Sequence, residues 1–175
     1  MPLAESLAAR WRSLPGIIRL EVAGPVRRRL EVAGAIDLAV ATDHPHQVLA
    51  ELEKVLGAEF VERTPGLAET TLPQGVPLNL TLAAPAGFGA AWLAATGNAE
   101  HFRALTEVAR EHHLELTPQG LWAEGVLQPS REEEDIYRRL GLPLIPPELR
   151  EGAGEIEAGR ENLLPRLITP GDIRG

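Results

Sequence analysis

The chain has 175 residues, a size that suits one domain or two small ones, and its 44% hydrophobic and 24% charged residues are typical of a globular protein. A formal net charge of −8 argues against a surface built as a whole to coat nucleic acid, although it leaves room for local basic patches. Because cysteine is absent, any metal must be bound through oxygen or nitrogen. No apolar run reaches the roughly 18 to 20 residues that span a bilayer, and no signal sequence is present, which predicts a cytoplasmic protein without a membrane partner.

Periodicity and turn residues predict the elements of the first half. A helix with Leu3, Leu7 and Trp11 on one face ends before Pro15, and another ends at Gly57. Alternation and apolar runs predict strands over residues 17–23, 35–41, 59–63, 68–72 and 76–82. Pro77 places the last of these at an edge or a bulge.

The second half is predicted to be mostly helical, with helices over residues 87–95, 98–112 and 130–140 and short strands over 114–116 and 121–126. Ser130 and Glu133 have the spacing of a capping box, so the acidic run 132–135 is interpreted as a helix start. The three tryptophans are interpreted as core residues. The fold class is therefore α+β: a small mixed sheet flanked by helices in residues 1–85, then a mostly helical part with a short β element in residues 86–175.

Charge is distributed unevenly along this chain. Residues 1–30 carry six arginines and two glutamates, a local charge of +4, whereas residues 131–161 carry nine acidic and five basic residues, a local charge of −4. The acidic total therefore conceals a basic N-terminal end.

The spacing between residues 24 and 37 is the most specific feature. A turn with three arginines, Gly24 to Arg29, precedes a strand that carries Asp37, and Asn79 falls on a later strand. The stretches 88–97, 133–143 and 145–157 follow in matching order. Together these motifs, which cover nearly the whole chain, resemble the palm and thumb of bacterial family X DNA polymerases. The resemblance implies a nucleotidyltransferase-type palm in residues 1–85 and a thumb in residues 86–175.

The family carries three aspartates where this chain has one. Phosphoryl transfer uses two divalent ions about 3.5 to 4 Å apart, held by clustered carboxylates. The first aspartate position holds Ala35 and the third holds Asn79, so Asp37 is the remaining catalytic carboxylate and metal ligand. The resemblance therefore implies at most weak binding of Mg²⁺ or Mn²⁺. Asp37 could also serve only a local hydrogen bond or Arg28.

The same resemblance assigns further residues. It implies that Gly24, Arg28, Thr96 and Gly97 bind the nucleotide and that Arg27 and Arg29 contact DNA, although the three arginines could also form a solvated turn. Two departures weaken the nucleotide site. Pro25 replaces a serine that would donate to the triphosphate, and Ala94-Ala95 replaces an aromatic pair beside the sugar.

Three functional hypotheses follow. The first is a catalytically impaired palm and thumb of the DNA-repair type, a pseudoenzyme that keeps contact with DNA or dNTP, or acts as a scaffold beside a phosphoesterase domain. The second is an active nucleotidyltransferase that recruits other acids, such as Glu31 or Glu69. The third is a protein-interaction module. Residues 172–175 resemble the start of the polymerase-and-histidinol-phosphatase domain, which leaves open whether the chain is an isolated piece or part of a longer protein.

Overall fold

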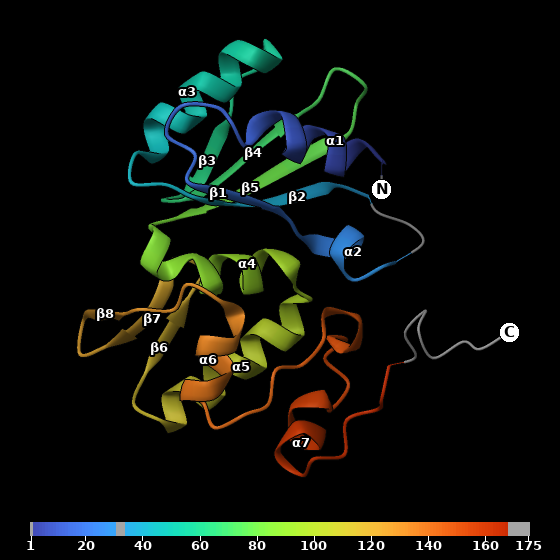
Figure 1. Cartoon of the computed structure of the whole chain (residues 1–175), viewed down its shortest axis with the longest axis vertical. Coiled ribbons are helices and arrows are strands. Elements are labelled where there is room, and N and C mark those ends of the chain that lie inside the picture. The colour runs from blue at the N-terminus through green and yellow to red at the C-terminus, as the bar shows by residue number, and fades with distance from the viewer. Residues whose placement is uncertain (1, 31–33, 168–175) are drawn as a thin grey trace, which may run out of the picture.

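A five-stranded mixed sheet organises the first half of the chain (Figure 1). The computed structural model describes residues 2–30 and 34–167. The strand order is β1-β2-β5-β4-β3, in which β2 and β5 are parallel and the other neighbours antiparallel. The strands are β1 (Arg19–Val22), β2 (Ile36–Ala41), β3 (Val61–Thr64), β4 (Leu67–Thr71) and β5 (Pro77–Ala83). The predicted mixed sheet and the α+β class are confirmed.

Alternation along the central strands gives the sheet two different faces. Leucine, isoleucine and valine from β1, β2 and β5 point to the face covered by α1 (Pro2–Trp11) and α3 (Pro45–Leu56), where the main core lies. The other face carries small and polar residues. There Ala39 and Ala41 let α4 (Phe88–Thr96) approach closely, and Phe88 packs against both.

A second core forms around α4 in the C-terminal half (Figure 1). Its helices are α5 (Ala99–Glu111), α6 (Glu133–Arg139) and α7 (Glu155–Arg160), with short 3-10 turns η1 (Pro85–Gly87) and η2 (Pro147–Leu149). A three-stranded antiparallel sheet is built from β6 (Glu115–Thr117), β7 (Gly120–Ala123) and β8 (Val126–Gln128). Helix α4 thus packs on both the large sheet and the C-terminal half.

Three local predictions were wrong. The strand predicted over 121–126 is a hairpin, because Glu124 and Gly125 take positive φ angles of 50° and 78° and turn the chain. Pro77 is the first residue of the central strand β5, where its missing N–H is tolerated. The capping box of α6 consists of Glu132 and Asp135, not of Ser130 and Glu133.

Within residues 2–30 and 34–167, every helix is too short or too polar to cross a bilayer. The suggested ligand Glu31 and the motif at residues 172–175 lie outside the described residues.

Candidate functional site

A row of polar side chains crosses the α4 face of the large sheet. Asp37 on β2 is in register with Asn79 on β5, and Asn79 is in register with Glu69 on β4. The Asn79 amide Nδ2 donates to Asp37 Oδ1 at 2.9 Å. Glu69 is partly exposed and accepts from Arg63 Nε at 2.8 Å. The sheet therefore brings Asp37 and Asn79 into direct contact, with Glu69 one strand further away.

Asp37 is held from several sides. Its backbone oxygen accepts from Ala23 N at 2.8 Å, which ties β2 to the start of helix α2 (Gly24–Arg27). Gly24 has a φ of 63°, and a Cβ there would overlap the Asp37 carboxylate, so only glycine fits. Burial raises the pKa of Asp37 above its ordinary value, against the opposing effects of the Asn79 hydrogen bond and the Arg28 charge.

This geometry does not fit a pair of divalent ions. A metal needs lone pairs, and Asn79 turns an N–H donor toward Asp37, the one carboxylate at the three family positions. Ala35, at the first family position, lies just before β2 and has no ligand atom. No cluster of three or more acidic or histidine side chains suited to a metal occurs among the described residues.

The three arginines after Gly24 have different environments. Arg28 is half-buried, and its Nε has no hydrogen-bond partner in the described part of the chain. Arg29, with a φ of 59°, forms an exposed ion pair from Nε to Glu148 Oε1 at 3.1 Å. Arg27 turns into the protein. The predicted basic turn therefore exists, but two of its charges already have partners in the C-terminal half.

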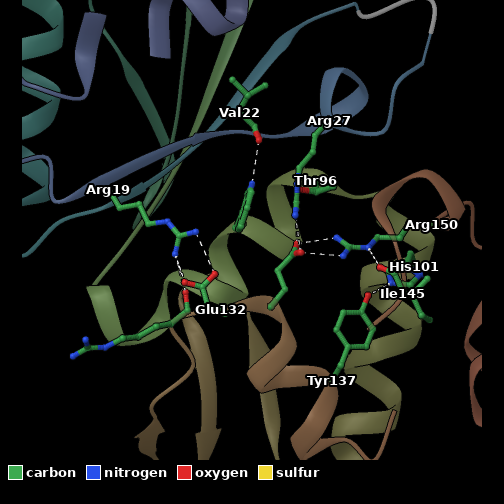
Figure 2. Close-up of polar contacts among 12 residues, drawn as sticks. Arg19, Val22, Arg27, Thr96, His101, Glu132, Tyr137, Ile145 and Arg150 are labelled. Atoms are coloured by element: carbon green, nitrogen blue, oxygen red, sulfur yellow. Dashed lines mark hydrogen bonds and ion pairs between the residues drawn. The ribbon is translucent and has the colours of Figure 1, made fainter. Parts of the chain in front are cut away.

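Glu133 is the buried carboxylate that pairs with both Arg27 and Arg150, the two arginines labelled beside it in Figure 2. Arg27 Nη1 and Nη2 donate to its two carboxylate oxygens at 2.6 and 2.8 Å, and Arg150 Nη1 and Nη2 donate to the same oxygens at 2.8 and 3.0 Å. Although burial alone would raise the pKa of Glu133, the Arg150 and Arg27 hydrogen bonds hold it below its ordinary value. The run 132–135 thus contains a buried charge as well as a helix cap.

Arg27 is held further by α4. Its Nη1 donates to Thr96 Oγ1 at 2.7 Å, and its guanidinium carbon lies 3.6 Å from the ring centre of Trp92. Trp92 Nε1 donates to Val22 O at 3.1 Å, so this half-buried tryptophan joins β1 to α4. The predicted nucleotide residue Thr96 is buried and its hydroxyl serves this contact. Gly97 ends α4 with a φ of 68°.

A second ion pair links the two halves beside the first (Figure 2). Arg19 Nη1 donates to Glu132 Oε1 at 2.6 Å, and Arg19 also lies over the rings of Phe88 and Trp92 at 4.5 and 5.1 Å. The basic N-terminal end and the acidic C-terminal segment are therefore paired with each other.

A groove of about 560 Å³ runs next to the polar row on the same face of the sheet. It is lined by Leu67 and Thr81 of the sheet and by Ala94 and Phe102 of the helices. Ala94 is one of the two positions where the family resemblance implies an aromatic side chain. Because alanine has only a methyl side chain, the groove lacks an aromatic ring at this position.

Sequence reasoning missed a buried network in the C-terminal half. His101 Nδ1 lies 2.6 Å from Glu155 Oε1, and His101 Nε2 lies 2.7 Å from the Tyr137 hydroxyl. Burial lowers the pKa of His101, while the Glu155 hydrogen bond opposes the change. The partners are 36 and 54 residues apart in sequence, and no periodic signal connects them.

Comparison with known proteins identifies the likeness. A family model described as the DNA polymerase beta thumb matches residues 91–151. The protein named DNA polymerase/3'-5' exonuclease PolX of Bacillus subtilis (strain 168) is 28% identical over 178 residues, which cover 99% of this chain. The chain is therefore similar to family X DNA polymerases, in residues 91–151 by the thumb model and over nearly its whole length by PolX. This polymerase-like region spans 31% of the length of PolX.

Proposed function

We propose that this polymerase-like region is impaired in nucleotidyl transfer and is retained for contact with DNA or a nucleotide, or as a scaffold. The observation that carries the proposal is the hydrogen bond from Asn79 to Asp37. The amide presents a donor to Asp37 Oδ1 where the family has a third carboxylate, so it adds no negative charge and cannot offset the charge of a catalytic ion. With Ala35 at the other position, the site has one carboxylate for two ions.

The retained contact is assigned to Arg28. Its Nε is buried without a partner in the described part of the chain, and an unmade hydrogen bond from a buried charged group is costly. A phosphate oxygen is an acceptor that suits a guanidinium. Arg28 lies beside Asp37, whose negative charge limits but does not cancel this attraction. We assign no DNA contact to Arg27, because Glu133 and Thr96 occupy its guanidinium.

The proposal includes a division into a palm of residues 1–85 and a thumb of residues 86–175. Support comes from the two main apolar clusters, one in each part, and from the thumb family match at residues 91–151. A role in DNA repair, a cytoplasmic location and an adjacent phosphoesterase domain also belong to the proposal. The similar protein PolX is named as both a polymerase and a 3'-5' exonuclease.

Primer extension on a gapped duplex with Mg²⁺ or Mn²⁺ tests the catalytic part of the proposal. The expected result is no incorporation by the wild type, and incorporation that appears or rises in the variant Ala35→Asp/Asn79→Asp. Clear wild-type incorporation that Asp37→Ala abolishes would overturn the proposal.

Binding of the same duplex, measured by fluorescence anisotropy, tests the contact. Arg28→Gln should weaken binding and reduce its salt dependence, whereas Arg138→Gln, at an exposed position of α6, should change it little. Absence of binding by the wild type and by every variant tested would favour the protein-interaction module instead.

The register of Glu69 supports one alternative, an active enzyme with a substitute acid. Glu69 is the carboxylate directly across from Asn79 on the polar row. If this acid holds an ion, any wild-type incorporation should be lost in Glu69→Gln. The pairing of Glu69 with Arg63 makes this the second candidate.

A further inference from the structure

The ion pair between Arg29 and Glu148 is far more exposed to solvent than the pair between Arg27 and Glu133, although both join the basic turn to the C-terminal half. The Arg27 and Glu133 side chains are 17% and 5% exposed. The Arg29 and Glu148 side chains are 71% and 27% exposed. A solvated pair of this kind is worth about 0 to 1 kcal/mol, so an anion in solution can displace it.

Glu148 is nevertheless held in place. It lies in the 3-10 turn η2, between Pro147 and Leu149, and Arg150 follows directly at the end of that turn. The side chain of Arg150 is fully buried, bonded to Glu133 and, through Nε at 2.9 Å, to Ile145 O (Figure 2). The carboxylate therefore reaches Arg29 from a fixed piece of backbone, which keeps it close to the arginine at little entropic cost.

We propose that Glu148 is a built-in competitor for the phosphate contact of Arg29. In this arrangement Arg27 has a structural role, Arg28 makes the phosphate contact proposed above, and Arg29 is released only when a polyanion such as the DNA backbone replaces Glu148. The contact lowers the affinity of the basic turn for nucleic acid. The inference rests on the proposed function, because it assumes that the turn meets DNA.

The fixed backbone of Arg29 and the exposure of its guanidinium both support competition between Glu148 and a phosphate. Arg29 adopts a left-handed backbone conformation, fixed by hydrogen bonds from Arg29 N to Val26 O and from Leu30 N to Pro25 O. The side chain therefore starts from a defined position beside Arg28, while its guanidinium remains mostly in water. A phosphate bound at Arg28 and a carboxylate at Glu148 are two anions near the same arginine, and they compete for it.

The test is a double-mutant cycle on binding of a short gapped duplex, measured by anisotropy over a range of salt concentrations. Glu148→Gln should tighten binding about 2- to 5-fold, the factor that corresponds to a solvated ion pair. It should also steepen the slope of log K against log salt by about 0.9, the value for one added phosphate contact. Arg29→Gln should weaken binding, and Glu148→Gln should have no effect in the Arg29→Gln background. Glu157→Gln, at an exposed site on α7, is the control for net charge.

The outcomes separate this inference from the proposed function. If the wild type binds and Glu148→Gln matches Glu157→Gln, the competition is refuted while the proposed function stands. If Glu148→Gln still tightens binding without Arg29, the effect is general electrostatics and the inference is wrong. If neither the wild type nor Glu148→Gln binds, both fall together. Binding by Glu148→Gln alone would support the competition in its strongest form.

Discussion

Replacing Glu133 by glutamine should destabilise the protein severely. The substitution keeps the size of the side chain but removes the charge that balances Arg27 and Arg150. Arg150 is fully buried, so it would remain as an uncompensated cation in the interior. Breaking a buried ion pair in this way typically costs about 3 to 5 kcal/mol. For a chain of this length about 2 to 4 °C is lost per kcal/mol, which corresponds to a fall in Tm of about 6 to 20 °C.

Urea denaturation followed by circular dichroism measures the effect. The neighbouring Glu132→Gln is the matched control, since it removes an acid of the same helix start that is 53% exposed and paired with Arg19. That change should cost about 0 to 1 kcal/mol. Glu133→Met/Arg150→Met should recover part of the loss, because the two most buried charges are then both absent. Arg27 loses its carboxylate in this variant but keeps Thr96 and Trp92 as partners. Equal losses for Glu133→Gln and Glu132→Gln would refute the assignment of Glu133 as the buried link between the two halves.

Two further stability measurements test the environments of His101 and Gly24. Stability should fall as pH drops below about 6.5, because the unfolded chain gains a proton that the buried His101, with its lowered pKa, resists. The fall should be smaller in His101→Gln, and identical pH profiles from thermal melts would speak against this origin. Gly24→Ala should cost clearly more than Gly57→Ala, since both have φ near 60° but only at Gly24 does a Cβ meet Asp37. Equal melting temperatures for the two variants would contradict the close packing.

Much of the sheet could be predicted because its signals are local. The apolar alternation of β2 and β5 determines which face each residue joins, and the glycine at position 57 ends α3 with a φ of 65°. The contact between Asp37 and Asn79 also follows once the two strands are neighbours.

The links between the halves could not be predicted in the same way. Arg27 and Glu133 are 106 residues apart, and each has a local interpretation that is complete in itself: a basic turn and an acidic helix start. The uneven charge was a signal, yet it is compatible with an external polyanion as well as with internal pairing. In the structure Arg19, Arg27 and Arg29 are all paired with acids from the C-terminal half.

The central claim, that the polar row cannot hold the catalytic ions, is tested most directly by Mn²⁺ binding to the protein, followed by electron paramagnetic resonance. The account predicts that the wild type binds Mn²⁺ no more tightly than Asp37→Ala does. It also predicts that Ala35→Asp/Asn79→Asp gains a site that requires Asp37. A wild-type site that disappears in Asp37→Ala would contradict the account.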